Sequence, residues 1–301
     1  MLVTIGGREA NACRNAGGSF AAVTTADGRH GELAERVAAL DWYHTLELAP
    51  GVVTPGWQDT RGALAEIPIP ASLEGKRCLD VGTFDGFWAF ELERRGADEV
   101  VAIDVLEPAK FDWPADSEPE AIEIIGARKG KGLGFEIARE VFGSSVKRLE
   151  RSVYDLTEDD AGRFDFIYLG SLLVHLRDPV RALTRLRAVC DGSLLVVDGI
   201  DLPLSLAFPR QPIARLDGRG RPWWWWANSA GLARMVEAAG FEITEGPRRV
   251  FLDPGAGQEL PPRGAALLRA APRLLRSREG RLALLLATKG DPHAVIVARP
   301  A

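Results

Sequence analysis

Cysteine is scarce in this 301-residue chain, which has only Cys13, Cys78 and Cys190. Three widely separated cysteines do not make the framework of a small disulfide-bonded secreted domain, and we expect Cys78 and Cys190 to be reduced thiols in the core. Histidine is equally sparse, and none of the four histidines has a cysteine or histidine partner at a metal-ligand spacing. The sequence therefore predicts no metal site.

Long hydrophobic runs are also missing. No apolar stretch is long enough to span a bilayer, and the first residues lack the basic and apolar regions of a secretory signal. We therefore expect a soluble, cytoplasmic protein without a membrane span. The net charge of -5 argues against a large nucleic-acid surface, while a hydrophobic content of 46% is ample for a core.

The most informative stretch is Lys76 to Val105. A short apolar run, Arg77 to Val81, predicts a strand that ends at a glycine turn between Gly82 and Gly86. A helix with an apolar face follows the turn, and a second strand, Glu99 to Ile103, ends at Asp104. This succession is half of a doubly wound nucleotide site, in which the acid accepts hydrogen bonds from ribose hydroxyls.

The glycine turn favours S-adenosylmethionine over NAD. A dinucleotide site uses a third glycine where this chain has Phe84, so that a pyrophosphate can approach the backbone. Asp85 would repel a diphosphate, whereas its charge suits a ligand with ammonium and sulfonium centres. An ordinary strand-to-helix turn remains the simpler interpretation of the glycines alone.

The turn resembles motif I of the class I S-adenosylmethionine-dependent methyltransferases, with its central glycine replaced. Three further stretches carry the resemblance, the second to class I methyltransferases in general and the first and third to the branch that contains the wobble-uridine tRNA methyltransferases. They are WYHTLEL with GVVTPGW before the core, FDFIYLGSLLVHLRDPVRAL after the fourth strand, and WWWWANSAGLARMVEAAGF near the carboxyl end. The resemblance covers most of residues 40–252 and the last strand.

This resemblance implies an α/β fold, a doubly wound, mostly parallel seven-stranded sheet of the Rossmann-like methyltransferase type. It also implies S-adenosyl-L-methionine as cofactor. The residues at the matching positions are Asp80, Gly82, Thr83, Phe84, Asp85, Gly86, Asp104, Val105, Ser152, Val153, Gly170, Ser171, Tyr43 and Thr54.

Two histidines are candidates for a general base. His175 lies shortly after the fourth strand and has a side chain of the type that can titrate near neutral pH, and His44 belongs to the segment expected to cover the site. A packing or capping role is an equally good interpretation of His175. Four adjacent tryptophans cannot all be buried on one face of a regular element, so we expect them to line an acceptor pocket. The predicted acceptor-binding residues are Trp223, Trp224, Trp225, Trp226 and Asn228.

We divide the chain into an N-terminal arm and helical flap (1–70), a cofactor-binding core (71–252 with 291–301) and a helical insertion (253–290). Within the core, helices are expected near residues 118–125 and 135–142, with a mobile basic loop between them. The arginines of the insertion could form an RNA surface, but a solvated helix face or a contact in a homodimer is the simpler interpretation.

Three functions fit these observations. A methyltransferase acting on oxygen or nitrogen of a small molecule, such as a bulky aromatic or glycosylated metabolite, is favoured by the acidic charge balance. A tRNA wobble-uridine methyl- or carboxymethyltransferase is the alternative, because aromatic side chains can stack on a base. A non-catalytic protein that binds a nucleotide or a partner is the third.

Overall fold

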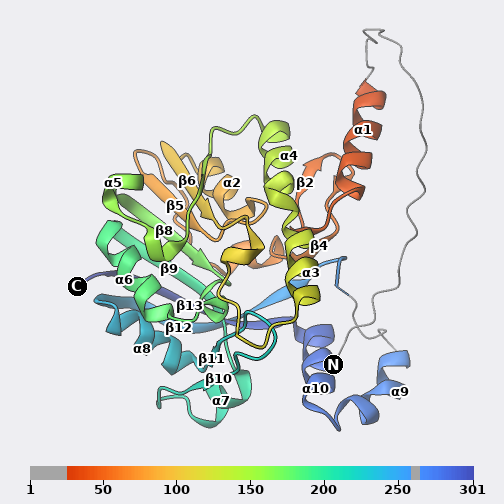
Figure 1. Ribbon diagram of the computed structural model, residues 1–301, viewed down its shortest axis with the longest axis vertical. Coiled ribbons are helices and arrows are strands. Elements are labelled where there is room, and N and C mark those ends of the chain that lie inside the picture. Colours follow the sequence, from red (N-terminus) through yellow and green to blue (C-terminus); the bar gives the residue numbers. More distant parts are fainter. Residues whose placement is uncertain (1–25, 259–264) are drawn as a thin grey trace.

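The computed structural model describes residues 26–258 and 265–301, and a large sheet crosses the middle of this part of the chain (Figure 1). Its nine strands lie in the order β1-β4-β12-β13-β9-β8-β5-β6-β7. They are β1 (Trp42–His44), β4 (Gly56–Asp59), β5 (Arg77–Val81), β6 (Glu99–Asp104), β7 (Lys147–Glu150), β8 (Phe164–Gly170), β9 (Cys190–Gly199), β12 (Phe241–Pro254) and β13 (Asp291–Pro300). Two short two-stranded sheets are formed by β2 (Glu47–Ala49) with β3 (Val52–Val53), and by β10 (Ala214–Leu216) with β11 (Trp225–Ala227).

The centre of the large sheet is the doubly wound arrangement expected from the sequence. β5 pairs in parallel with β6 on one side and with β8 on the other. β6 then pairs in parallel with β7, and β8 with β9. β13 then runs antiparallel to β9, so that His293 near its start lies opposite Gly199 at the end of β9. The carboxyl ends of β5, β6, β8 and β9 and the amino end of β13 therefore meet at one edge, where ligands gather in open α/β sheets.

Helices cover both faces of this sheet. The α-helices are α1 (Ala26–Ala38), α2 (Phe87–Arg94), α3 (Pro119–Lys129), α4 (Leu133–Phe142), α5 (Glu158–Ala161), α6 (Pro179–Val189), α7 (Leu202–Ala207), α8 (Ser229–Ala238), α9 (Ala265–Leu274) and α10 (Arg278–Lys289). The 3-10 helices are η1 (Gly62–Ala65), η2 (Pro108–Lys110), η3 (Gly130–Gly132), η4 (Val153–Asp155) and η5 (Leu173–His175).

The alternation of side chains along the strands divides the core into two clusters. In β5, Cys78 packs into one cluster and Leu79 into the other, because successive strand residues point to opposite faces. The first cluster takes the apolar faces of α2 and α4, and the second takes those of α6 and α8. Cys78 and Cys190 are buried free thiols, which confirms their prediction.

The prediction of seven strands is wrong by two. The two extra strands come from the segment before the core, because β12 extends to Pro254 and pairs through Asp253 with Asp59 of β4. β4 then pairs in parallel with β1, where Trp42 lies opposite Gly56. β12 spans 14 residues, and this length leaves its far end available for pairing with β4.

The predicted basic loop between the two helices of the core is also wrong. α3 continues to Lys129, and only η3 separates it from α4, which begins at Leu133. Glycines at positions 130 and 132 adopt positive φ angles of 51° and 76°, so the chain changes direction within one short turn. This connection places Lys129 at a fixed position rather than on a loop.

The flap made by β1 to β4 is fastened to the glycine turn by Asp85. Its carboxylate accepts hydrogen bonds from the backbone N–H groups of Tyr43 (2.8 Å) and His44 (3.0 Å), and its other oxygen contacts His44 Nδ1. Asp85 and His44 are 3% and 4% exposed. Thr54 strengthens the flap, since its hydroxyl donates to the His44 carbonyl (2.7 Å) and accepts from the Leu46 N–H (2.7 Å).

We predict that Asp85→Ala lowers the free energy of unfolding by about 3–5 kcal/mol, because it leaves two buried N–H groups and a buried imidazole without their acceptor. Urea denaturation measures this change. Asp41→Ala, which removes an exposed carboxylate from the same segment, serves as the control and should change stability little. Equal midpoints for the two variants would contradict the role of Asp85.

Candidate cofactor and acceptor site

The glycine turn follows β5 directly and has an unusual backbone. Gly82 (φ 79°), Phe84 (φ 52°) and Gly86 (φ 93°) all lie in the left-handed region, and phenylalanine is rarely found there. A Cβ atom at position 86 would come within 2.4 Å of the Phe90 ring, so glycine is required at this point. Asp80, just before the turn, is buried, and this burial raises the pKa of its carboxyl group to about 6.

Asp104 lies beside this turn, at the carboxyl end of β6. One of its carboxylate oxygens accepts the Phe84 N–H (2.9 Å) and the other accepts the Val105 N–H (2.8 Å). These contacts orient the carboxylate and connect it to the turn. The sequence predicts that the glycine turn and this acid lie together, and in the structure they are in contact.

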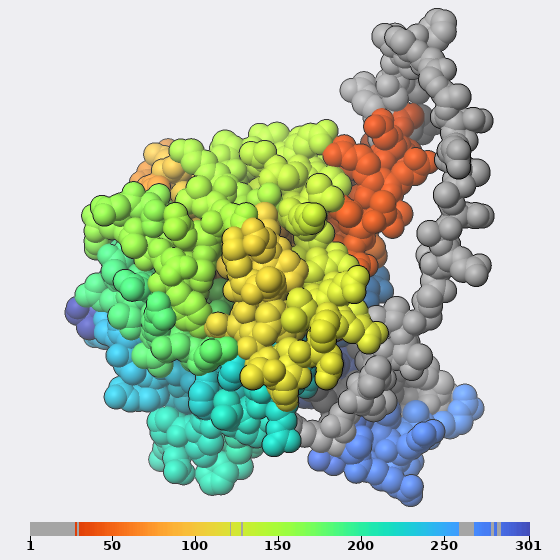
Figure 2. Space-filling model, in the orientation of Figure 1, coloured from red at the N-terminus to blue at the C-terminus, as the bar shows by residue number. Residues whose placement is uncertain are grey.

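Lys129 closes the space in front of Asp104. Its ammonium group forms an ion pair with the Asp104 carboxylate, donates to the Val105 carbonyl (3.1 Å), and lies 5.2 Å from the ring centroids of Phe84 and Phe111. The hollow between Phe84 and Lys129 has a volume of about 10 Å³, which is room for about one water molecule. The segment that carries η2 and α3, coloured yellow, covers the middle of the face shown in Figure 2.

The remaining residues proposed for the cofactor lie at the same sheet edge. Gly170 ends β8 and Ser171 follows it, while Ser152 caps η4 after β7 by accepting the Tyr154 N–H, and Val153 is buried. Tyr43 reaches the turn from the flap, where its ring lies 5.0 Å from that of Phe84. The oxygens of Asp85 face the flap, and the Thr54 hydroxyl is held by flap backbone, so both side chains bind protein groups here.

The tryptophan run lies at the edge formed by η5, β10 and β11. Trp223 lies 6.4 Å from both the His175 and the Trp226 rings, measured between centroids. Trp226 approaches the end of β9, where a Cβ atom at Gly199 would lie 3.7 Å from its ring. Trp224 and Trp225 instead donate their indole N–H groups to the carbonyls of Asp112 (2.6 Å) and Arg177 (2.9 Å).

The two predicted bases have different surroundings. His175 donates from Nδ1 to the Pro222 carbonyl (2.8 Å), because a carbonyl can only accept. Burial lowers the pKa of His175 to about 4, and the nearby positive charge of Lys129 adds to this effect. His175 is therefore neutral at pH 7, whereas the Nδ1 of His44 contacts Asp85 and its ring stacks on Phe87.

Asn228, predicted to bind the acceptor, instead caps the start of α8. Its side chain is fully buried, accepts the N–H groups of Gly231 and Ile213, and donates to the carbonyls of Phe208 and Gln211. All its strong hydrogen-bonding groups are thus used by the backbone at the start of α8.

Sequence reasoning missed two residues of this edge. Lys129 belongs to the segment predicted to be a mobile basic loop, and His293 is one of the four histidines without a metal-ligand partner in the sequence. His293 is 2% exposed, and its Nε2 lies 2.8 Å from the Ser171 hydroxyl, 122 positions earlier in the chain. The only sequence signal for His293 was its place at the start of the last strand, since an antiparallel neighbour of β9 begins where β9 ends.

Comparison with known proteins assigns the family. The family model described as a methyltransferase domain matches residues 57–245, which is more than half of the chain. This chain belongs to the methyltransferase domain family. A search of curated proteins finds no match to its sequence.

Several solved structures are similar to this methyltransferase. The N-terminal domain of EvdMO1, crystallised in the presence of SAH and D-fucose, is 17% identical with a TM-score of 0.50, covering 90% of this chain and 97% of that one. The 1,6-didemethyltoxoflavin-N1-methyltransferase of Burkholderia thailandensis is 17% identical with a TM-score of 0.40, covering 75% and 71%. The [4+2]-cyclase SpnF is 16% identical with a TM-score of 0.47, covering 90% and 92%.

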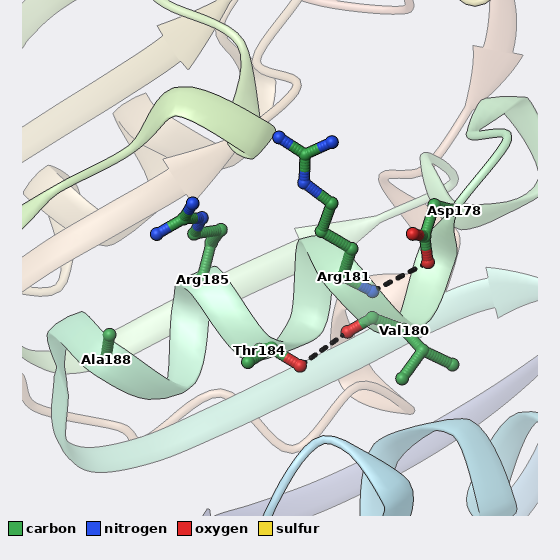
Figure 3. Close-up of a pocket in the computed structure, with 6 residues that line it drawn as sticks. All are labelled: Asp178, Val180, Arg181, Thr184, Arg185 and Ala188. Atoms are coloured by element: carbon green, nitrogen blue, oxygen red, sulfur yellow. Dashed lines mark hydrogen bonds between the residues drawn. The ribbon is translucent and has the colours of Figure 1, made fainter.

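A surface hollow elsewhere on the methyltransferase does not belong to this site. It has a volume of about 480 Å³ and runs along α6, where Arg181 and Arg185 lie on the same side (Figure 3). The face of α6 that packs on the sheet carries Leu183 and Leu186, so the hollow lies on the outer side of the helix. Within the described residues, no cluster of three metal-ligating side chains occurs, and no helix is long and apolar enough to cross a membrane.

Lys129→Met should increase the affinity for S-adenosylhomocysteine about tenfold, because it frees the oxygens of Asp104 from a competing charged donor. Asp104→Ala should weaken the same binding by about tenfold or more, because it removes the acceptor for ribose hydroxyls. Isothermal titration calorimetry measures both. Weaker binding by Lys129→Met would show that the ammonium group supports the ligand.

His175 predicts a specific dependence of stability on pH. Its pKa is lowered to about 4 in the folded chain from an ordinary value of 6.5, so the unfolded chain binds more protons between these values. The free energy of unfolding therefore falls as the pH falls through this window. As the pH falls through this window, the urea midpoint of His175→Gln should fall less than that of the wild type. His30→Gln, which removes an exposed histidine, should keep the wild-type dependence, and the same slope in all three proteins would contradict the assignment.

Proposed function

We propose that this methyltransferase uses S-adenosylmethionine to methylate an oxygen or nitrogen atom of a small-molecule acceptor. The observation that carries the proposal is the common edge at which the glycine turn and Asp104 lie at the ends of β5 and β6, while Trp223 and Trp226 lie beside the end of β9. A donor site and an aromatic acceptor wall on one sheet edge suit transfer between two bound molecules.

The residues around the glycine turn suit the donor. When bound, S-adenosylmethionine supplies a methyl group that is activated by the positive charge of its sulfur. The Asp104 carboxylate, oriented by two backbone N–H groups, would hold the ribose hydroxyls, and the positive φ angles of the turn allow a ligand to approach the backbone. Lys129 must move aside or share the carboxylate for this ligand to enter.

The acceptor wall favours a flat or glycosylated small molecule. Trp223 and Trp226 are half-buried, and the Arg221 guanidinium lies 3.7 Å from the centroid of the Trp223 ring, so an acceptor would stack on the other face of Trp223. The structural neighbour EvdMO1 was crystallised with a sugar, D-fucose, which supports a glycosylated acceptor. The net charge of -5 supports a small acceptor over tRNA.

Binding experiments test the two parts of the proposal separately. Native mass spectrometry followed by calorimetric titration should show binding of S-adenosylmethionine and S-adenosylhomocysteine but not of NAD. Methyl transfer from radiolabelled donor should then be screened against aromatic and glycosylated small molecules and against bulk tRNA. Binding of NAD alone would overturn the donor, and transfer only to tRNA would overturn the acceptor class.

We predict that Trp223→Ala raises the KM for the acceptor about tenfold or more, because it removes a stacking surface from the acceptor wall. The dissociation constant of S-adenosylhomocysteine should stay within about twofold, since Trp223 lies on the acceptor side. Trp57→Ala, which removes a partly exposed tryptophan of β4, is the matched control. An unchanged KM in Trp223→Ala would remove this residue from the acceptor site.

A further inference from the structure

Two helices near the carboxyl end of the chain stand apart from the core. α10 packs on β12, and α9 packs on α10. In Figures 1 and 2 the two helices, coloured blue, project from one corner of the molecule. Among the side chains that the structure describes, none from α9 or α10 belongs to either core cluster. We call this element, residues 265–289, the α9–α10 hairpin.

The hairpin carries charge of the opposite sign to the rest of the chain. Residues 265–289 contain six basic side chains and one acidic one, a net charge of +5, whereas the whole chain has a net charge of -5. The other residues together therefore carry a net charge of -10. An excess of positive charge confined to one projecting element favours contact with a negatively charged surface.

One side of α9 presents apolar side chains to solvent. Leu268, Pro272 and Leu275 are spaced by four and three residues, so they lie on the same side of the helix. The helical hydrogen bonds reach this far, because the Leu275 N–H donates to the Ala271 carbonyl (2.9 Å). Leu268 is 76% exposed and Leu275 is 52% exposed. At least half of each leucine is therefore open to solvent.

A row of arginines runs beside these leucines. Arg269, Arg273 and Arg276 repeat the same spacing one position later, and all three are exposed. Among the side chains that the structure describes, no carboxylate pairs with any of the three. Arg281 of α10 instead donates to the Leu275 carbonyl (3.1 Å) and holds the turn between the helices. An apolar row and a basic row therefore lie side by side on the outer surface of α9.

α10 adds further apolar surface to the hairpin. Leu284, Leu285 and Leu286 are consecutive, so their side chains point in directions about 100° apart around the helix. Each of the three is half-buried. Packing on β12 therefore covers only part of the apolar surface of α10.

These features favour a lipid surface over RNA or a second copy of the chain. Residues 265–289 contain no aromatic residue, so they have no ring to stack on a base, and bound RNA would leave the leucines in water. Two copies paired hairpin to hairpin would bring like charges together. The surface of an anionic bilayer suits both rows, because leucines enter the boundary of the acyl chains while arginines keep their charge at the lipid phosphates.

We propose that the α9–α10 hairpin binds this methyltransferase to the surface of a membrane that contains anionic lipids. α9 lies in the plane of the headgroups, with Leu268 and Leu275 inserted and the arginine row at the lipid phosphates. The contact is peripheral, since α9 and α10 have 10 and 12 residues and are too short to cross a bilayer. The proposal depends on neither the methyl donor nor the acceptor.

Vesicle flotation with the full chain tests this contact. The protein should float with vesicles of phosphatidylcholine mixed with phosphatidylglycerol, and it should stay in solution with vesicles of phosphatidylcholine alone. Raising the salt concentration from about 0.1 M to about 1 M should weaken the binding, because it shortens the range of charge attraction from about 10 Å to about 3 Å. No binding to the anionic vesicles, or equal binding to both kinds, would overturn the proposal.

Substitutions test the two rows of α9 separately. A triple variant with Arg269→Gln, Arg273→Gln and Arg276→Gln should bind the anionic vesicles about a hundredfold more weakly, because it removes three charges from the lipid contact. Leu268→Ser should weaken the binding about tenfold, because it removes an inserted apolar side chain. Wild-type binding by the triple variant would contradict the proposal.

Matched controls remove the same groups from other exposed positions. The control triple variant, with Arg181→Gln, Arg185→Gln and Arg234→Gln, loses the same charge from α6 and α8. Leu206→Ser removes a leucine of α7 that is 60% exposed. Both controls should bind the vesicles as the wild type does. Equal weakening by the two triple variants would make total charge the cause and would refute a role of the hairpin.

Analytical ultracentrifugation, with and without bulk tRNA, tests the other two occupants. The wild type and the triple variant of α9 should have the same oligomeric state and should not bind tRNA. A dimer or a tRNA complex that only the wild type forms, with no binding to anionic vesicles, would assign the arginine row to that partner and overturn the proposal.

Discussion

The buried carboxylate of Asp85 is the constraint on which the site depends. It accepts two backbone N–H groups of β1 and contacts the His44 ring, so the glycine turn and the flap are held as one unit. This contact holds the flap beside the turn, where the Tyr43 ring lies 5.0 Å from that of Phe84. The charge that sequence reasoning assigned to a bound sulfonium compound is used instead to hold the protein together.

A second ion pair, between Lys129 and Asp104, lies beside the glycine turn and leaves only a small hollow there. Lys129 and Asp104 lie at the meeting point of α3, β6 and the turn, where both side chains are largely buried. The pair neutralises the Asp104 carboxylate, which also accepts two backbone N–H groups, and it places the ammonium group of Lys129 near the rings of Phe84 and Phe111. In the proposed function the same contact closes the donor site and holds the end of α3, so ligand entry would exchange one for the other.

Local patterns predicted the central strands well, because their signals are strong and continuous. Leu194 to Val197 form an unbroken apolar run that only a strand covered on both faces would bury, and Asp178 before Pro179 marks the start of α6. The pattern failed at 126–134, where four glycines and three basic residues resemble a loop although the helices on either side continue through most of it. It also failed for β1 and β4, whose few residues join the sheet because β12 is long enough to pair with β4.

The sequence by itself determined the fold class, the glycine turn with its acid at Asp104, and the methyltransferase family, since each is encoded in residues close together in the chain. Tertiary structure alone decided which side chains meet. His293 has no informative neighbour in sequence, and it reaches Ser171 because β13 runs antiparallel to β9 and begins where β9 ends. Lys129 likewise reaches Asp104 only through the turn of η3. Contacts between distant segments depend on strand order and helix ends, which local periodicity does not specify.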